Sequence, residues 1–343
     1  MTETIEQTAA ERYRARPLTR VQRLRRLLHR HPGISPTVVL LGSVISFWLI
    51  NDRFLLPANL SLILQQVAII GALAVGQTMI VLTAGIDLSV GAIMIFVTMV
   101  MGTLAGELGV PGVLAFVVGA AVGAAAGLVN GILVAYVKLP PFIVTLGTLG
   151  VFTALALLMS GGRSIRGDVL GSFLTWTATP VGLGPFNLTV GVLLVLLMYA
   201  GVAFALSQTS WGRHVYAVGN DPAAARLAGI RVRAVLLSVY VSAGVVFAFA
   251  AWVLIGRVGA ATTNSAVDAN LDSITAVVIG GTSLFGGRGR VLGTLLGALI
   301  VGVFRNGLAL ARVDVLWQTF AIGVLIIAAV SLDQWIRRTG AQR

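Results

Sequence analysis

Residues 211–233 read WGRHVYAVGNDPAAARLAGIRVR and lie between two long apolar runs. Asp221 is a predicted helix N-cap, Pro222 suits the first helical position, and Gly229 can end a helix. The sequence therefore predicts a short capped helix inside an arginine-rich connection between two apolar segments. An ordinary basic loop, in which the proline and the glycine are only turn residues, is the alternative.

The composition is typical of a polytopic membrane protein. Hydrophobic residues make up 57% of the chain, charged residues 10%, and the mean hydropathy is +0.96, which is too apolar for a soluble domain of this length. The net charge of +12 would suggest nucleic acid binding in a soluble protein. Here the arginines cluster between apolar runs, so membrane topology and anionic lipid explain the charge and no nucleic acid partner is expected.

The residue types present argue against chemistry in this chain. There is no cysteine to ligate a metal, and the single lysine, Lys138, does not stand in a phosphate-binding loop. We expect no catalytic residue, no cofactor and no metal site. If ATP drives this protein, another subunit binds the ATP.

The apolar runs predict an all-α fold with about ten transmembrane helices. About 20 residues are needed to cross a bilayer, and the third and eighth runs fall short. The predicted spans are residues 37–51, 60–84, 90–105, 111–136, 142–160, 188–206, 235–255, 271–284, 291–310 and 315–332. They define a transmembrane domain over residues 37–333. An N-terminal arm, residues 1–36, precedes this domain and is predicted to form a short interfacial helix, and a tail, residues 334–343, follows it.

The basic residues set the orientation. With both termini in the cytoplasm, most of the 24 lysines and arginines fall in cytoplasmic segments, among them the connection 207–234. The opposite orientation reverses this bias. A cleaved signal peptide would place its apolar core nearer to the first residue, so the arm is expected to be retained.

Spans two to five and seven to ten form two blocks of four helices that enter the membrane from opposite sides, which predicts two inverted repeats. Asp87 before the third span corresponds to Asp272 in the eighth, and Asn130 corresponds to Asn306. Glycines spaced by four put small residues on one helix face and let backbones pack closely. These glycines are Gly119, Gly123, Gly127 and Gly131, and then Gly289, Gly293 and Gly297. Short spans at matching places in two halves indicate a transport pathway.

Seven polar residues are candidates for the translocation path. Inserting a carboxylate within a transmembrane span costs about 2.5–3.5 kcal/mol, so Asp87 within the membrane would need water or backbone groups as partners. The alternative is that Asp87 only caps the third span at the membrane surface. Ser89 would permit a broken helix with free N–H groups beside Asp87. Thr145 and Thr148 share a helix face, where they line a passage or bond back to their own helix. The candidates are Gln77, Asp87, Ser89, Asn130, Thr145, Thr148 and Asn306.

Four stretches resemble, in order, the ribose/xylose-type sugar permeases of ABC importers. They are AVGQT and LTAGIDLSVG (74–78 and 82–91), VNG and KLPPFIVTLGT (129–131 and 138–148), the connection 211–233, and LDSITAVVIGGTSLFGGRG (271–289). The resemblance covers about 60 to 332. It departs from the family at Ala223, where many members have glutamate.

The resemblance implies the permease subunit of an ABC importer in a bacterial inner membrane, working as a homodimer surrounded by lipid. A monosaccharide would come from an extracytoplasmic solute-binding protein on the side of the external loop 161–187, and a separate cytoplasmic ATPase would drive import. The helix in 207–234 would dock into a groove of that ATPase, and Ala225 is expected to be small for that reason. The implied coupling residues are Gly212, Arg213, Asp221, Pro222, Ala224, Ala225, Arg226 and Gly229.

Three alternatives stay open. Related permeases carry nucleosides or autoinducer-type furanosides, and nothing in the sequence separates these from a sugar. An ion-coupled secondary transporter would place ionisable residues near mid-membrane, whereas the acidic residues here lie near span ends. An intramembrane enzyme would need a nucleophile with a base or metal ligands, but the three histidines, His29, His31 and His214, all fall in predicted cytoplasmic segments.

Overall fold

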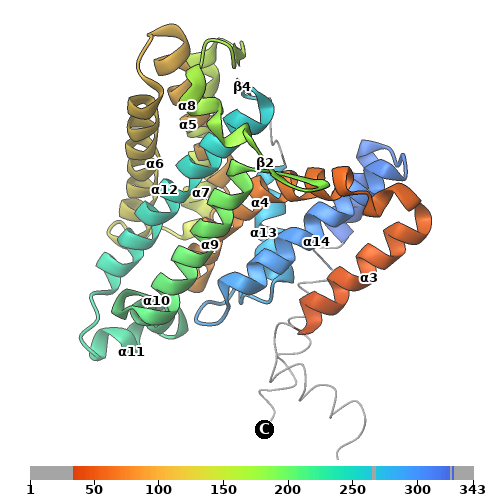
Figure 1. Ribbon diagram of the computed structural model, residues 1–343. Coiled ribbons are helices and arrows are strands. Elements are labelled where there is room, and N and C mark those ends of the chain that lie inside the picture. The colour runs from red at the N-terminus through yellow and green to blue at the C-terminus, as the bar shows by residue number, and fades with distance from the viewer. Residues whose placement is uncertain (1–33, 265–267, 325–326, 328–343) are drawn as a thin grey trace, which may run out of the picture.

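The computed structural model describes residues 34–264, 268–324 and 327, and this part is mostly helical (Figure 1). Seven described helices are long and apolar enough to cross a membrane, which confirms an all-α polytopic membrane protein. They are α4 (Pro57–Leu82), α5 (Val90–Gly102) with its π-helical extension η2 (Thr103–Glu107), α6 (Gly112–Ala135), α7 (Pro141–Ser160), α9 (Val190–Gln208), α12 (Val232–Val258) and α14 (Val291–Leu310).

The other three predicted spans coincide with shorter apolar helices, which are α3 (Ile34–Ile50), α13 (Ala269–Ile279) and a helix at Val315–Val324. The eighth span is short, as predicted. The third is longer than predicted, because η2 continues the helix as far as Glu107. The count of ten spans is not confirmed and stays a prediction. The interfacial helix of the arm, the tail and the end of the tenth span lie outside the described residues.

Short elements connect the long helices. At one end of the molecule are α10 (Ser210–Asn220) and α11 (Pro222–Leu227). Elsewhere the chain forms η1 (Asp52–Leu55), β1 (Ile165–Arg166), α8 (Gly171–Thr175), η3 (Trp176–Ala178), β2 (Pro180–Leu183), β3 (Phe186–Thr189) and β4 (Ala260–Ala261). The segment 161–187 is thus more than the predicted loop: β2 pairs antiparallel with β3, and β1 with β4. Strand pairing satisfies backbone groups that a plain loop would leave to water.

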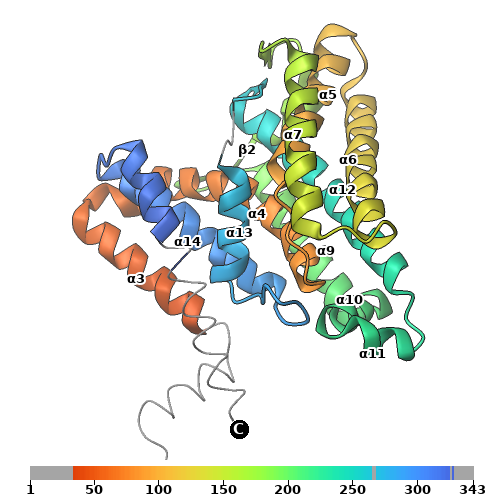
Figure 2. The same cartoon turned by 180° about the vertical axis from the view of Figure 1, so that it is seen from behind.

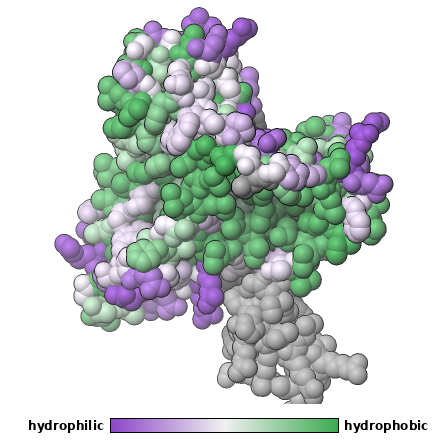
Figure 3. All heavy atoms as spheres, in the orientation of Figure 1, coloured by the Kyte–Doolittle hydropathy of each residue, from purple (hydrophilic) through white to green (hydrophobic). Residues whose placement is uncertain are grey.

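Figures 1 and 2 show that the molecule has two flanks, each formed by a group of helices. One flank contains α5, α6, α7, α9 and α12, which run side by side, and the other contains α3 and α14, which lie together. Helix α4 contacts both α12 and α14 and so joins the flanks. Figure 3 shows apolar side chains spread across the middle of the molecule, with polar side chains at the end formed by α10 and α11 and at the opposite end. This distribution fits a protein whose middle faces lipid.

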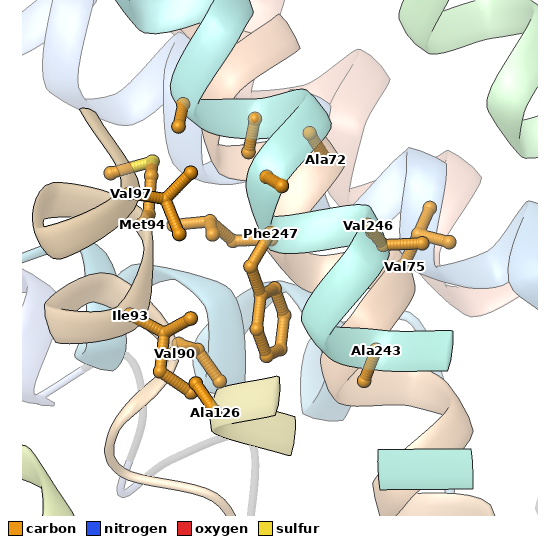
Figure 4. Packing of buried hydrophobic residues seen from close by; sticks show 14 of the residues in the cluster. Ala72, Val75, Val90, Ile93, Met94, Val97, Ala126, Ala243, Val246 and Phe247 are labelled. Atoms are coloured by element: carbon orange, nitrogen blue, oxygen red, sulfur yellow. The ribbon is translucent and has the colours of Figure 1, made fainter. Parts of the chain in front are cut away.

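The buried core lies where α4, α5, α6 and α12 meet (Figure 4). Phe247 of α12 is 1% exposed, and its ring lies against Gly76 of α4, where a Cβ atom would overlap it. The ring thus fills a space that only glycine leaves open. Around it pack aliphatic side chains of all four helices, including Ala72, Val75, Val90, Ile93, Met94, Val97, Ala126, Ala243 and Val246.

The predicted close packing along the glycine face of α6 is confirmed. A Cβ atom on Gly127 would overlap the Tyr240 carbonyl of α12, and a Cβ atom on Gly244 would overlap the Gly123 carbonyl. The backbones of α6 and α12 therefore touch directly, as small residues on one helix face allow.

The second predicted glycine face is confirmed for two of its three members. Gly293 of α14 approaches the backbone of Gly280, the C-cap of α13, and Gly297 approaches the backbone of Ala276 within α13. The inclusion of Gly289 was wrong: it lies before α14 with φ of 154°, so it belongs to the preceding turn.

We expect Gly244→Val to lower the yield of folded protein severalfold. The new side chain would overlap the Gly123 carbonyl, and overpacking typically costs about 1–3 kcal/mol. The matched control is Gly147→Val, because nothing lies within 4 Å of a Cβ atom at Gly147. The measurement is the monodisperse fraction after detergent extraction; equal yields for the two variants would contradict the role of this contact.

Candidate functional site

Five of the seven predicted pathway residues meet in one buried group, which we name the polar cluster. Its members are Gln77 of α4, Asp87 and Ser89 of the connection between α4 and α5, Asn130 of α6 and Thr145 of α7. Each is at most 1% exposed. The cluster therefore joins three helices to one short connection in the interior of the protein.

Asp87 organises the cluster through hydrogen bonds. Its Oδ1 accepts from the Ser89 backbone N–H at 2.7 Å and from the Ser89 Oγ at 2.6 Å. The Asn130 Nδ2 donates to the Ser89 Oγ at 3.0 Å and, at a longer 3.5 Å, to the Asp87 Oδ2. Ser89, not Asp87, is the N-cap of α5, so Asp87 holds the turn before the helix instead of capping it. Within the described residues no ion pair reaches Asp87, and hydrogen bonds alone hold its carboxylate.

The other helices hold the backbone of the same connection. The Gln77 amide, oriented so that both its polar atoms are satisfied, donates to the Asp87 carbonyl at 3.1 Å and accepts from the Asp87 N–H at 3.3 Å. The Thr145 Oγ1 lies 3.1 Å from the Ile86 carbonyl and 2.9 Å from the Pro141 carbonyl of its own helix. Thr148 is also buried and bonds back to the Thr145 carbonyl at 3.4 Å. The connection is thus fixed by both side chains and backbone.

Two buried polar atoms near Asp87 have no partner among the described residues. They are the Oδ1 of Asn130 and the phenol oxygen of Tyr240 in α12. The phenol oxygen lies 3.1 Å from the position of a Cβ atom on Gly85. Sequence reasoning missed Tyr240, although a tyrosine within a long apolar run is a visible signal. The region around the polar cluster therefore has hydrogen-bonding capacity that the described residues do not use.

Asn306 does not belong to the polar cluster. Its amide exchanges two hydrogen bonds of 3.0 Å with the amide of Asn59, which ties α14 to α4. Asp272, the predicted counterpart of Asp87 in the second repeat, bonds Arg305 at 2.9 Å, and Arg305 also bonds Asp268 at 3.2 Å. The predicted counterparts have different partners, so these contacts do not confirm the inverted repeat.

The capped helix predicted in 211–233 is α11. Asp221 is its N-cap, and the Oδ1 of Asp221 accepts from the N–H groups of Ala223 at 2.8 Å and Ala224 at 3.0 Å. Pro222 occupies the first helical position. The predicted start of the helix is confirmed, and a hydrogen-bonded cap holds it.

The end of α11 is also as predicted. Gly229 has φ of 81°, and its N–H donates to the Arg226 carbonyl at 3.0 Å. The Ile230 N–H donates to the Ala225 carbonyl at 3.0 Å. These two bonds form a Schellman motif, which needs a residue with a positive φ. The connection is therefore an ordered element, and the ordinary loop is excluded.

The predicted coupling residues divide by exposure. Arg213 and most of the α11 residues are exposed, whereas Gly212 and Ala225 are buried in the protein itself. Ala225 is only 4% exposed and belongs to the hydrophobic core of this chain. The explanation that Ala225 is small to fit a groove of the ATPase was therefore wrong, because its own chain already buries this side chain. The exposed set is Arg213, Asp221, Pro222, Ala224, Arg226 and Gly229.

The sequence analysis chose Gly212 on this surface but neither Leu227 nor the cap at Thr209. Leu227 at the end of α11 is 91% exposed, and an apolar residue in a polar connection is the signal that could have found it. Gly212 allows the sharp turn from α9 into α10, because a Cβ atom there would overlap the Leu206 carbonyl. Thr209 caps α10 by accepting from the Gly212 N–H at 3.1 Å. The element that presents Leu227 is therefore anchored at its start.

The fold and these two sites define a helical transport protein: apolar helices, a buried polar cluster between them, and an ordered polar element at one end. Residues 59–330 match the family described as branched-chain amino acid transport system / permease component. The chain therefore belongs to a family of transport permeases and not of enzymes, and its curated relatives place it among the sugar permease components of ABC importers.

The chain is 46% identical to the fructose import permease protein FrcC of Rhizobium meliloti, over 94% of this chain and 91% of that protein. It is 40% identical to the ribose import permease protein RbsC of Bacillus subtilis, over 88% and 92% of the two chains. It is 34% identical to the galactose/methyl galactoside import permease protein MglC of Escherichia coli, over 88% and 93%. No solved structure matches the chain.

Proposed function

We propose that this chain is the membrane subunit that moves an uncharged monosaccharide into a bacterial cytoplasm. The observation that carries the proposal is the similarity, over at least 88% of the chain, to import permeases named for fructose, ribose and galactose. These solutes share neutral rings with many hydroxyl groups and differ in ring size. Fructose is the first sugar to test, because its permease has the highest identity of the three.

The polar cluster supports a route for such a solute. A neutral sugar crosses apolar surroundings only if protein groups replace its hydrogen bonds to water. The oxygens of Asn130 and Tyr240 beside Asp87 have no partner in the part of the chain that the structure describes, and they offer one acceptor and one hydroxyl for this purpose. We infer that the translocation path passes the polar cluster, with Gln77, Asp87, Ser89, Asn130, Thr145 and Thr148 near it. Asn306 would act elsewhere along the path, at the contact with Asn59.

The ordered element α10–α11 supports a separate ATPase as the source of energy. It protrudes at one end of the molecule (Figure 1) and presents Leu227 beside the exposed Arg226. The core of an interface is apolar and its rim is polar, so a docked partner that covers Leu227 would leave Arg226 at the rim. We infer that the ATPase docks here, that both termini share this cytoplasmic side, and that a binding protein docks at the opposite end. A second copy of the chain would complete the pathway.

The test is uptake into proteoliposomes that contain this permease and the ATPase encoded beside it, with the neighbouring binding protein added outside. We expect saturable uptake of fructose, ribose, xylose or galactose that needs ATP and binding protein and persists when ionophores remove proton and sodium gradients. Uptake driven by an ion gradient without ATPase would show a secondary transporter. Uptake of nucleosides alone, or of anionic solutes alone, would overturn the sugar assignment.

A further inference from the structure

Three segments of the chain meet in direct backbone contact where α4 ends. The Gly287 N–H, in the turn between α13 and α14, donates to the Leu82 carbonyl at 2.9 Å. Gly219, near the end of α10, lies so close that a Cβ atom there would overlap the same Leu82 carbonyl. We name Leu82, Ala84, Gly219, Gly286 and Gly287 the glycine junction. No side chain separates the three backbones at Leu82, so they contact one another without an adjustable layer.

The backbone of the glycine junction is held in restricted conformations. Gly286 has φ of 80° and Gly287 has φ of 68°, which L-residues with a side chain rarely adopt. A Cβ atom on Gly286 would lie 2.5 Å from the Gly219 carbonyl and 2.9 Å from the Ala84 side chain. Ala84 itself has φ of 61° despite its side chain. Such a conformation persists only where the surroundings determine it, so the contact is tight and specific.

Tyr216 of α10 stabilises the same contact. Its hydroxyl donates to the carbonyl of Gly289, in the turn between α13 and α14, at 2.9 Å. Burial raises the pKa of the Tyr216 phenol, while the charge of Arg290 lowers it by less. The phenol therefore stays neutral and keeps its proton for this bond. Helix α10 is thus attached to the turn by a side chain as well as by backbone contact.

The glycine junction leads directly to the polar cluster. Ala84 lies in the connection between α4 and α5, two residues before Ile86, whose carbonyl contacts Thr145, and three residues before Asp87. On the other side, α10 continues into α11 at Asp221. One continuous set of contacts therefore runs from the exposed α11, through α10 and the glycine junction, to the connection that carries Asp87.

We propose that the glycine junction transmits movement of α10–α11 to the connection 83–89 and so changes the polar cluster during transport. Gly219, Gly286 and Tyr216 are positioning residues in this step; none of them needs to touch the solute. The inference rests on the proposed function, because it takes the ATPase as the source of the movement. Closely packed elements have low compressibility, so a displacement of α10 moves Leu82 and Ala84 with it.

The first test compares Gly219→Ala, Gly286→Ala and Tyr216→Phe with wild type in proteoliposomes that contain the ATPase. The readout is the amount of sugar imported per ATP hydrolysed. We expect this ratio to fall roughly two- to thirtyfold in the glycine variants, and less in Tyr216→Phe, while the ATPase still co-purifies. The matched control is Gly201→Ala, because nothing lies within 4 Å of a Cβ atom there, and it should keep the wild-type ratio.

A purely structural role would lower abundance, transport and ATP hydrolysis together and leave the ratio unchanged, which would overturn the proposal. A second experiment uses only wild type and the mild variant Tyr216→Phe. Adding ATP should change the rate of amide hydrogen exchange of residues 83–89 in the wild-type complex, and it should change that rate less in Tyr216→Phe. An equal response in the two proteins would also overturn it. If wild type itself imports no sugar with ATP, the proposed function fails; if wild type imports sugar and all three variants match Gly201→Ala, only the junction fails.

Discussion

Leu227→Asp is expected to release the ATPase from the permease while the permease stays folded and inserted. Leu227 is 91% exposed, so its replacement leaves the core of this chain intact. At a docking interface, burying a leucine side chain contributes about 1.5–3 kcal/mol, and an unpaired carboxylate in its place adds a desolvation cost. A loss of that size lowers association by about tenfold or more.

The measurement is co-purification of the ATPase together with ATP-dependent uptake. Leu227→Met is the control, because it keeps an apolar side chain of similar volume. This variant should still co-purify with the ATPase and should keep ATP-dependent uptake. An aspartate variant that keeps the ATPase and full transport would remove Leu227 from the docking surface. Ala225→Arg is not a substitute for this variant, because Ala225 is buried in the permease and arginine there should lower the abundance of the protein itself.

Asp87→Leu is expected to prevent stable folding, whereas Asp87→Asn should fold. Leucine would leave the Ser89 N–H and the Ser89 hydroxyl without their acceptor, and each unsatisfied buried group costs about 1–3 kcal/mol. Asparagine keeps an oxygen at Oδ1 for both bonds from Ser89. The measurement is the yield of monodisperse protein after detergent extraction, followed by uptake for the variants that fold.

The pair Asp87 and Asn130 also allows a reciprocal exchange. Asn130→Asp alone would place a second carboxylate against Asp87, and like charges in the interior repel each other. The double variant Asp87→Asn with Asn130→Asp restores one carboxylate and one amide, and it should recover much of the yield lost by Asn130→Asp. Failure of the exchange to recover any yield would show that the two side chains do not depend on each other.

Features that depend on neighbouring residues could be predicted from the sequence. The length of each apolar run predicted the long helices, because a helix must present about 20 consecutive apolar residues to cross a bilayer. The cap at Asp221 and the turn at Gly229 were also predictable, since their hydrogen bonds reach only two to five residues along the chain. The glycine face of α6 followed from spacing alone. The residues of the polar cluster were recognisable as costly polar groups, although the sequence did not tell which of them would meet.

The tertiary structure decided which helix faces meet. Helices that are apolar all round carry no sequence signal for their partners, so nothing predicted that Asn130 would join Asp87 while Asn306 joins Asn59. The same limit hid the burial of Ala225 and the approach of Gly287 to Leu82, because both depend on how distant helices pack. Caps and helix lengths arise from local hydrogen bonds and hydrophobicity; the polar cluster and the glycine junction arise from contacts that exist only once the whole bundle has formed.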